Sequence, residues 1–276
     1  MRQNILPSPS DAMPASPPSS RLSLPQVTLC AISSVNMAAT LQALAISMEK
    51  ADFAKCLLLT DVDIGPAPFG VEVVRIAKMT SSAAYSQFLL AHLADYITTS
   101  HCLVVQWDGH VINADGWQPH YLDFDYIGAS WPQFTDGHNV GNGGFSLRSQ
   151  RLLRLCQSPR FVPAHPEDLT ICRKNRPWLE SQGMRFAPDF IADCFSAERA
   201  GDVHSTFGYH GVWHMPRVLG HNKFWQIYCG LDDRGTVRHD WSHIVRRMME
   251  GPSGYKRALR IMIDQLRDGF RKGKRS

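Results

Sequence analysis

The first part of the chain alternates between short apolar runs and segments in which apolar residues recur at helical spacing. The short runs are rich in aliphatic and β-branched residues, as strands are, and the longer segments place an apolar residue every three or four positions. In chain order the segments are "VTLCAIS", "MAATLQALAISMEKA", "KCLLLTD", "VEVVRI" and "SAAYSQFLLAHLADYI", which leads into the apolar run 103–105. This order predicts an α/β fold with a mixed, mostly parallel sheet covered by helices on both faces.

The pattern changes after Asp108. "YLDFDYIGASW" predicts a short strand, and "NVGNGGFSLRS" predicts a glycine-bent segment that leads into the helix "SQRLLRLCQ". The segment "HPEDLTICRKNRPWLESQG" predicts one helix, with Pro166 near its start and Gly183 at its end. A last helix is predicted near the C-terminus. Its apolar face is formed by Leu259, Met262, Ile263, Leu266 and Phe270.

Composition divides the chain into three parts. Residues 1–25 are so rich in Pro and Ser that we expect a disordered lead. Residues 26–230 contain most of the predicted strands and helices and are expected to form one domain. Residues 231–276 form a C-terminal extension with a basic amphipathic helix. The chain is long enough for a substantial core, with 44% hydrophobic and 20% charged residues.

Charge and cysteine content narrow the class of protein. The net charge is +4, and residues 256–276 alone hold eight Lys or Arg against two Asp, so the rest of the chain is near neutral and nucleic acid is not an expected partner. The seven cysteines include no CxxC pair, which is typical of free thiols in a reducing compartment. No apolar run reaches the roughly 18 residues of a membrane span, and the N-terminus lacks the apolar core of a signal peptide, so we expect a cytoplasmic protein.

Asp108 and His110 follow the apolar run in "HCLVVQWDGHVIN", at the point where a central strand is expected to end. Ligands of open α/β sheets bind beyond the carboxyl ends of the strands. Two residues apart on an extended backbone, this carboxylate and imidazole can reach one divalent cation, and His210 in "FGYHG" can complete the set. The alternative is a turn aspartate with histidines bonded to backbone. Three other histidines lie close enough in sequence to compete with His210, namely His204, His214 and His221.

Three other segments carry candidate binding or catalytic residues. In "VGNGGFSLRS" the glycines around Asn142 allow a ligand to approach the backbone and Asn142 can bind a polyol, although a tight hairpin turn explains the same residues. In "HPEDLT" either Glu167 or Asp168 can act as a general base, or both can simply favour the helix dipole. Gln106 and Trp131 are candidate substrate contacts, and core packing is the alternative for the tryptophan.

Taken together and in this order, "QWDGHVIN", "DYIGASW", "VGNGGFSLRS", "PEDLTIC" and "FGYHG" resemble an uncharacterised domain family of bacteria and eukaryotes that is grouped with the GT-A glycosyltransferases. The resemblance covers roughly residues 26–215. It implies a GT-A-like, Rossmann-like fold and transfer from a nucleotide sugar. In such enzymes an Asp-x-Asp-like motif after the fourth strand binds Mn²⁺ or Mg²⁺ and the donor diphosphate.

The resemblance also implies roles for individual residues. Asp108-Gly109-His110 stands where the metal motif is expected, similar to the Asp-x-His version of the polypeptide N-acetylgalactosaminyltransferases, and His210 becomes the third ligand. The remaining roles carried over by resemblance are donor-sugar or acceptor contacts for Asn142, Gly143 and Gly144, a base at Glu167 or Asp168, and a nucleoside contact at Asp61.

The sequence therefore predicts a metal-dependent glycosyltransferase that uses a nucleotide sugar, with a UDP-sugar as the expected donor. The expected acceptor is a glycan or lipid-linked hydroxyl in polysaccharide biosynthesis. The basic helix in residues 256–276 is expected to contact the inner membrane face, with packing on the domain as the alternative. Two other functions fit the same residues: a non-catalytic carbohydrate-binding or scaffold module, and a metal-dependent nucleotide-sugar hydrolase. The sugar, the linkage and the stereochemical course are left open.

Overall fold

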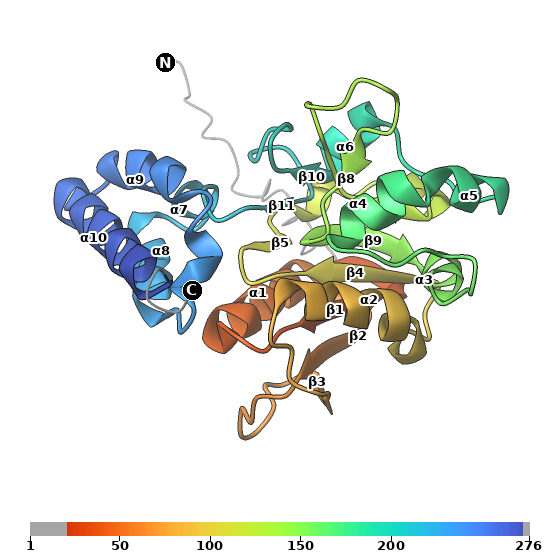
Figure 1. Cartoon of the computed structure of the whole chain (residues 1–276), viewed down its shortest axis with the longest axis horizontal. Helices are drawn as coiled ribbons and strands as arrows, with labels where there is room; N and C mark the ends of the chain where they lie inside the picture. Colours follow the sequence, from red (N-terminus) through yellow and green to blue (C-terminus); the bar gives the residue numbers. More distant parts are fainter. Residues whose placement is uncertain (1–20, 273–276) are drawn as a thin grey trace, which may run out of the picture.

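A six-stranded sheet forms the centre of the molecule (Figure 1). The structure is a computed structural model and describes residues 21–272. In spatial order the strands are β3 (Glu72–Arg75), β2 (Ala51–Thr60), β1 (Leu22–Ile32), β4 (His101–Val105), β9 (Phe145–Ser149) and β6 (Tyr126–Ile127). The first four run parallel, and β9 is antiparallel to both of its neighbours. The predicted α/β class with a mixed, mostly parallel sheet is confirmed.

Successive residues of β1 belong to two different hydrophobic clusters. Leu29 and Ala31 pack with Leu44 of helix α1 (Met37–Lys50), whereas Cys30 and Ile32 pack with residues of helix α2 (Ser82–Tyr96). Neighbouring side chains of a strand point to opposite faces of its sheet, so these two sets of β1 side chains lie on opposite faces. Helix α3 (Gln150–Cys156) contributes Leu153 to the cluster of α2.

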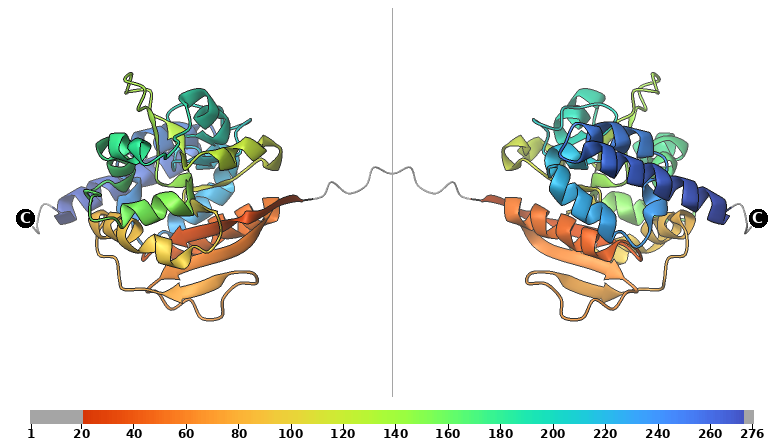
Figure 2. Two further views of the ribbon diagram at one scale, coloured as in Figure 1. Left: turned by 90° about the vertical axis from the view of Figure 1, so that its right-hand side faces the viewer. Right: turned by 90° about the vertical axis from the view of Figure 1, so that its left-hand side faces the viewer.

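Strand β1 begins earlier than its sequence suggests. Its first three residues pair with Ala51–Phe53 of β2, and the register shifts between Leu24 and Thr28, the interval that contains Pro25. Proline is tolerated in a strand at such an irregularity because no ladder hydrogen bond is required there. Residues 22–25 therefore lie in a strand rather than in the predicted lead, and residues 1–20 lie outside the described part of the chain. Figure 2 shows β1 and β2 side by side at one border of the molecule, with β3 outermost.

A second sheet of three short strands stands beyond the end of β4. Its strands are β10 (Ser196–Ala197), β11 (Gly208–His210) and β5 (Gly109–Val111), in that order. Strand β5 follows β4 through a tight turn, closed by a hydrogen bond from Gly109 N to Gln106 O at 3.0 Å. A two-stranded sheet of β7 (Ala129–Ser130) and β8 (Val140–Gly141) precedes β9.

The single helix predicted between Pro166 and Gly183 is divided into three pieces. They are α4 (Glu167–Leu169), the π-helical turn η3 (Thr170–Lys174) and α5 (Arg176–Ser181). The break occurs at Asn175, whose side chain bonds the backbone of Val162 instead of pointing to solvent. Gly183 has φ of 81° just after α5, so the predicted end of the helix is confirmed. The remaining elements between β5 and β11 are η1 (Ala114–Gly116), η2 (Pro119–Asp123) and α6 (Asp189–Phe195).

The C-terminal helices share one hydrophobic cluster with the second sheet. Trp107 and Tyr209 pack in this cluster with Phe224, Ile244 and Ile261. The elements are α7 (Met215–Val218), α8 (His221–Gly230), η4 (Arg234–Val237), α9 (Trp241–Met249) and α10 (Gly254–Lys272). Figure 1 shows α8, α9 and α10 gathered at one end of the molecule. No helix within residues 21–272 combines the length and apolarity needed to cross a bilayer.

Helix α10 exposes part of its predicted apolar face. Ala258, Ile261 and Asp264 are buried, and Asp264 accepts a hydrogen bond from Tyr228 of α8, whereas Leu259 is 55% exposed and Leu266 is 65% exposed. Met262 and Ile263 are half-buried, and Phe270 lies outside the side chains that the structure describes.

Candidate active site

A cavity opens at the carboxyl ends of β1 and β4. Its volume is about 550 Å³, and its wall includes Ser33 and Ser34 after β1, Ser81 and Tyr85 at the start of α2, and Gln106 after β4. Most of its polar groups are hydroxyls, and the described residues that line it include no Lys or Arg. A cavity of this size and chemistry suits an uncharged ring that carries hydroxyl groups.

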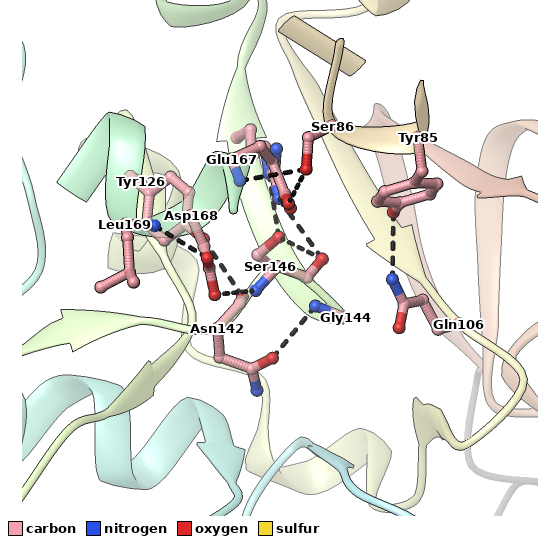
Figure 3. Close-up of polar contacts among 12 residues, drawn as sticks. Tyr85, Ser86, Gln106, Tyr126, Asn142, Gly144, Ser146, Glu167, Asp168 and Leu169 are labelled. Carbon is pink, nitrogen blue, oxygen red and sulfur yellow. Dashed lines mark hydrogen bonds and ion pairs between the residues drawn. The ribbon is translucent and has the colours of Figure 1, made fainter. Parts of the chain in front are cut away.

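Gln106 connects this cavity to a histidine. Its Nε2 donates to the Tyr85 hydroxyl at 3.2 Å, as Figure 3 shows, and its Oε1 lies 3.3 Å from His210 Nε2. Burial raises the pKa of Tyr85, so the phenol stays protonated at neutral pH. The predicted substrate residue Gln106 therefore lies where the cavity meets the second sheet.

His210 lies between two carboxylates. Its Nε2 is 3.5 Å from Asp108 Oδ1, and its Nδ1 is 3.3 Å from Glu198 Oε1. Burial alone would lower the pKa of His210, but the charges and hydrogen bonds of Asp108 and Glu198 outweigh burial and hold the pKa well above its ordinary value. The structure thus brings Asp108 and His210 together, as the sequence predicts.

His110 is not part of this group. In the antiparallel pairing of β5 with β11, His110 is opposite Tyr209 and Gly109 is opposite His210, so the two histidines project to opposite sides of the ribbon. The His110 ring packs edge-on against Tyr209, and its Nδ1 bonds the backbone carbonyl of Val111 at 2.9 Å. Burial lowers the pKa of His110 to about 4. The turn at 106–109 breaks the strand geometry that would have aimed Asp108 and His110 at one point.

The Asn-Gly-Gly segment runs between His210 and the acidic pair of α4. A Cβ atom on Gly144 would overlap the His210 ring, and one on Gly143 would overlap the Glu167 carboxylate. Asn142 has φ of 69°, and its Oδ1 accepts a hydrogen bond from Gly144 N at 3.0 Å. Its Nδ2 is buried and has no hydrogen-bond partner, so a donor group is available to a ligand acceptor at this point.

Glu167 is held in a buried ion pair. Its Oε1 lies 3.1 Å from the guanidinium of Arg148, which is fully buried in β9, and its Oε2 accepts from the Ser86 hydroxyl of α2 at 3.3 Å. Ser86 also bonds His165 Nδ1 at 2.8 Å. Figure 3 shows the Glu167 carboxylate turned toward Ser86. Both of its oxygens are therefore engaged by the protein.

Asp168 has a different environment from its neighbour. One carboxylate oxygen accepts from Gly143 N at 3.3 Å, and the other accepts from Leu169 N at 2.8 Å. Burial, with the nearby negative charge of Glu167, raises the pKa of Asp168 to about 6. A half-buried carboxyl group with this pKa can take a proton near neutral pH.

Two predicted substrate residues lie away from the cavity. Trp131 is 6% exposed in a cluster with Tyr126 and Leu152, and its ring packs on Gly141, so it is a core residue. Asp61 follows β2, and it is not among the residues that line the cavity.

The divalent cation implied by the resemblance fits Asp108 and His210. Asp108 Oδ1 is buried without a hydrogen-bond partner and faces His210 Nε2. A carboxylate oxygen and an imidazole nitrogen are suitable ligands for Mn²⁺, and a cation bound with a nucleotide takes its other ligands from phosphates and water. Within residues 21–272 there is no group of three or more His, Cys, Asp or Glu side chains arranged to hold a metal, and His110 projects to the other side of the β5–β11 ribbon from His210.

Sequence reasoning did not identify Glu198, Arg148 or Tyr85. Glu198 stands in "FSAERA", without a recognisable motif, and reaches His210 only because β10 and β11 are paired. Arg148 follows the glycine segment in a strand that is buried along its length, and a charged residue at such a position signals a buried partner.

Comparison with known proteins yields one family and a set of similar solved structures. The family profile "Protein of unknown function (DUF5672)" matches residues 69–210. The apo form of the glycosyltransferase GlyE of Streptococcus pneumoniae TIGR4 aligns at 13% identity with a TM-score of 0.39, over 78% of this chain and 63% of that one. Another GlyE structure aligns at 12% identity with a TM-score of 0.39, over 78% and 62%. The chain thus spans less than two thirds of either structure, and no curated protein matches it.

Proposed function

The chain belongs to the family DUF5672, whose function is unknown, and we propose that it is a metal-dependent glycosyltransferase with a GT-A-like fold whose sheet is covered by helices on both faces. The observation that carries this proposal is the convergence of four separate segments beyond β4. The pair Asp108–His210, the unpartnered Nδ2 of Asn142 and the carboxyl group of Asp168 surround the backbone of Gly143 and Gly144. Gln106 connects this group to a cavity lined mostly by hydroxyl groups.

The donor is a nucleotide sugar, with UDP-sugars as the first class to test. Its nucleoside occupies the cavity, because the hydroxyl-rich lining suits an uncharged ring and ribose. Its diphosphate extends past Gln106 to Asp108 and His210, the residues that would hold Mn²⁺ or Mg²⁺. A bound cation of this kind would stabilise the negative charge on the departing diphosphate.

Glu198 positions the imidazole for this role. The Glu198 carboxylate accepts a hydrogen bond from His210 Nδ1–H. This leaves Nε2 directed toward Asp108 and Gln106. Metal-binding histidines commonly donate their second ring N–H to a carboxylate, which fixes the orientation of the ring.

Asp168 is the general base of the proposed transfer. An acceptor hydroxyl must lose its proton as it attacks the anomeric carbon, and a carboxyl group with a pKa of about 6 matches that task. Asn142 Nδ2 is buried without a partner, and we propose that it donates to a sugar hydroxyl. Glu167 maintains the fold of this region through Arg148.

A turnover assay tests the proposal. The protein is incubated with Mn²⁺ and a panel of nucleotide sugars, and release of nucleoside diphosphate is measured with and without pooled glycan and lipid-linked acceptors. We expect release from one donor, increased by an acceptor and reduced ~100-fold or more in Asp168→Asn. If nucleoside diphosphate is released at the same rate with and without acceptors, the sugar is transferred to water and the protein is a hydrolase. If the protein binds its ligand but releases no nucleoside diphosphate, it is a non-catalytic module.

The acceptor is proposed to be a lipid-linked or surface polysaccharide precursor at the inner membrane face. Tyr255, Leu259 and Leu266 form an exposed apolar stripe on α10, with Lys256 and Arg260 among them. An apolar stripe bordered by cations favours an anionic lipid surface. A cytoplasmic location with peripheral membrane contact follows from the same proposal.

A further inference from the structure

One wall of the cavity comes from the C-terminal extension. Asp233, Gly235 and Thr236 line the cavity, although they lie about two hundred residues after β1 in the sequence. They belong to the segment 232–236, which connects α8 to the helices α9 and α10 and contains the start of η4. A cavity made mainly by the ends of β1 and β4 is thus completed by a part of the chain outside the matched family region.

Asn36 attaches this segment to the β1–α1 loop. Its Oδ1 accepts from Asp233 N at 2.9 Å, and its Nδ2 donates to Asp233 O at 3.2 Å and to Thr236 Oγ1 at 3.1 Å. Its own backbone N–H donates to the Asp232 carboxylate. Asn36 is 2% exposed and has φ of 52°, a conformation that few residues other than Asn and Gly adopt. Its amide therefore occupies both backbone groups of Asp233.

The segment is also fixed from within and at its ends. Gly235 N donates to Asp233 Oδ1 at 2.8 Å, and the Thr236 hydroxyl donates to Asp233 O at 2.7 Å. Leu231 and Val237, which flank the segment, are buried in the cluster of the C-terminal helices. The wall is a short, preformed structure, so a ligand meets it without first ordering a loop.

The chemistry of the wall restricts the ligand. Asp233 is the only carboxylate among the described residues of the lining, and no Lys or Arg opposes it. A negative side chain on this wall disfavours phosphate groups in the cavity and favours a neutral ring that offers N–H or hydroxyl donors. Phosphates are accordingly directed to the opposite side of Gln106, toward His210 and Asp108.

We infer that the segment 232–236 selects the nucleoside of the donor, and that Asn36 is the positioning residue that sets the distance of this wall from the ring. The inference rests on the proposed function. It assigns to the C-terminal extension a part in donor recognition, separate from the residues that bind the diphosphate.

Isothermal titration with two probes tests this inference. Asn36→Gly removes the amide and keeps the positive φ, and Asn139→Gly, which removes an Asn from a loop outside the cavity, is the matched control. With Mn²⁺ present, we expect the Kd of the preferred nucleoside diphosphate to rise ~10-fold in Asn36→Gly and its preference among UDP, GDP and CDP to shrink, while inorganic pyrophosphate binds as in the wild type.

The outcomes separate the two proposals. If wild-type protein binds no nucleotide, the proposed function fails and this inference fails with it. If the wild type binds and Asn36→Gly binds equally tightly with equal preference, this inference alone is overturned. Equal weakening of nucleotide and pyrophosphate would mean a general structural defect and would also overturn it. Should Asn36→Gly not fold, amide exchange in wild-type residues 231–237 decides: slower exchange with UDP but not with pyrophosphate is expected, and no difference would contradict the inference.

Discussion

The adjacent carboxylates of Glu167 and Asp168 differ because only one of them has a cationic partner. Glu167 forms an ion pair with the fully buried Arg148, whereas Asp168 accepts hydrogen bonds from the backbone N–H groups of Gly143 and Leu169. The sequence could not distinguish them, since two residues in the first turn of a helix look equivalent until the strand that faces them is known. We therefore propose a structural role for Glu167 and the role of general base for Asp168.

Replacing Glu167 with Gln should destabilise the fold. The substitution leaves Arg148 buried without a counter-charge, and breaking a buried ion pair in this way costs about 3 kcal/mol or more. Denaturant unfolding measures the change. Glu250→Gln is the matched control because it interrupts an exposed ion pair with Arg247, and its effect should stay below ~1 kcal/mol. Equal, small effects of the two substitutions would contradict this account of Arg148.

Replacing Asp168 with Asn should remove activity and increase stability at neutral pH. The folded-state pKa of about 6 lies above the ordinary value of 3.8, so the folded protein holds the proton more tightly and loses stability as the pH rises between these values. Asn has no ionisable group, so the variant does not lose this stability as the pH rises. The free energy of unfolding should therefore increase by about 1–3 kcal/mol above about pH 6 and remain unchanged near pH 4.

The same pKa predicts the pH dependence of turnover. In the wild type kcat/KM should fall below about pH 6 as Asp168 becomes protonated. The residual activity of Asp168→Asn should lack this acidic limb. If kcat/KM of the variant still falls below about pH 6, the base is another residue.

Gly144→Ala tests the packing of the glycine segment against His210. The added methyl group would overlap the imidazole, so the ring must move away from Asp108. We expect Mn²⁺-dependent nucleotide binding to weaken at least ~10-fold while the thermal transition stays cooperative. Gly230→Ala is the control, since a Cβ atom at Gly230 would meet no neighbouring atom. If Gly144→Ala binds the nucleotide with wild-type affinity, the position of the His210 ring is not required for this binding.

At the scale of elements, periodicity predicted the sheet and its helices but not the points where backbone geometry changes. The β1, α1, β2, α2 and β4 elements follow directly from their apolar spacing. The early start of β1 was missed because Pro25 argues against a strand, and the break at Asn175 was missed because it depends on a bond to Val162. His110 was misplaced because spacing alone does not reveal the turn at 106–109.

The exposed stripe of α10 makes a prediction at this scale. Leu259→Glu and Leu266→Glu each add a negative charge to a surface proposed to meet anionic lipid, so binding to vesicles that contain phosphatidylglycerol should fall ~10-fold or more. Nucleotide binding should not change, because α10 does not line the cavity. Co-sedimentation measures the partition, with uncharged phosphatidylcholine vesicles as the comparison. Unchanged partition in both variants would remove the membrane contact from the proposal.

For the whole molecule, the candidate site could be predicted as a set of motifs but not as an arrangement. "QWDGH", "GNGG", "PEDL" and "GYH" were recognisable because each combines polar residues with glycines or a helix start. That Gly143 and Gly144 separate Glu167 from His210, that Glu198 supports His210, and that the C-terminal extension completes the cavity all depend on contacts between distant segments. Such contacts have no local signal in one sequence.

The central claim is that Asp108 and His210 hold a divalent cation with the diphosphate of a nucleotide. Isothermal titration of the wild type with UDP, GDP and CDP, each with and without Mn²⁺, tests it most directly when repeated on Asp108→Ala and on Asp123→Ala, an exposed control. The account predicts that one nucleotide binds only with Mn²⁺, that Asp108→Ala abolishes this binding, and that Asp123→Ala preserves it. Nucleotide binding that is independent of Mn²⁺ and survives in Asp108→Ala would contradict the claim, as would the failure of every nucleotide to bind the wild type.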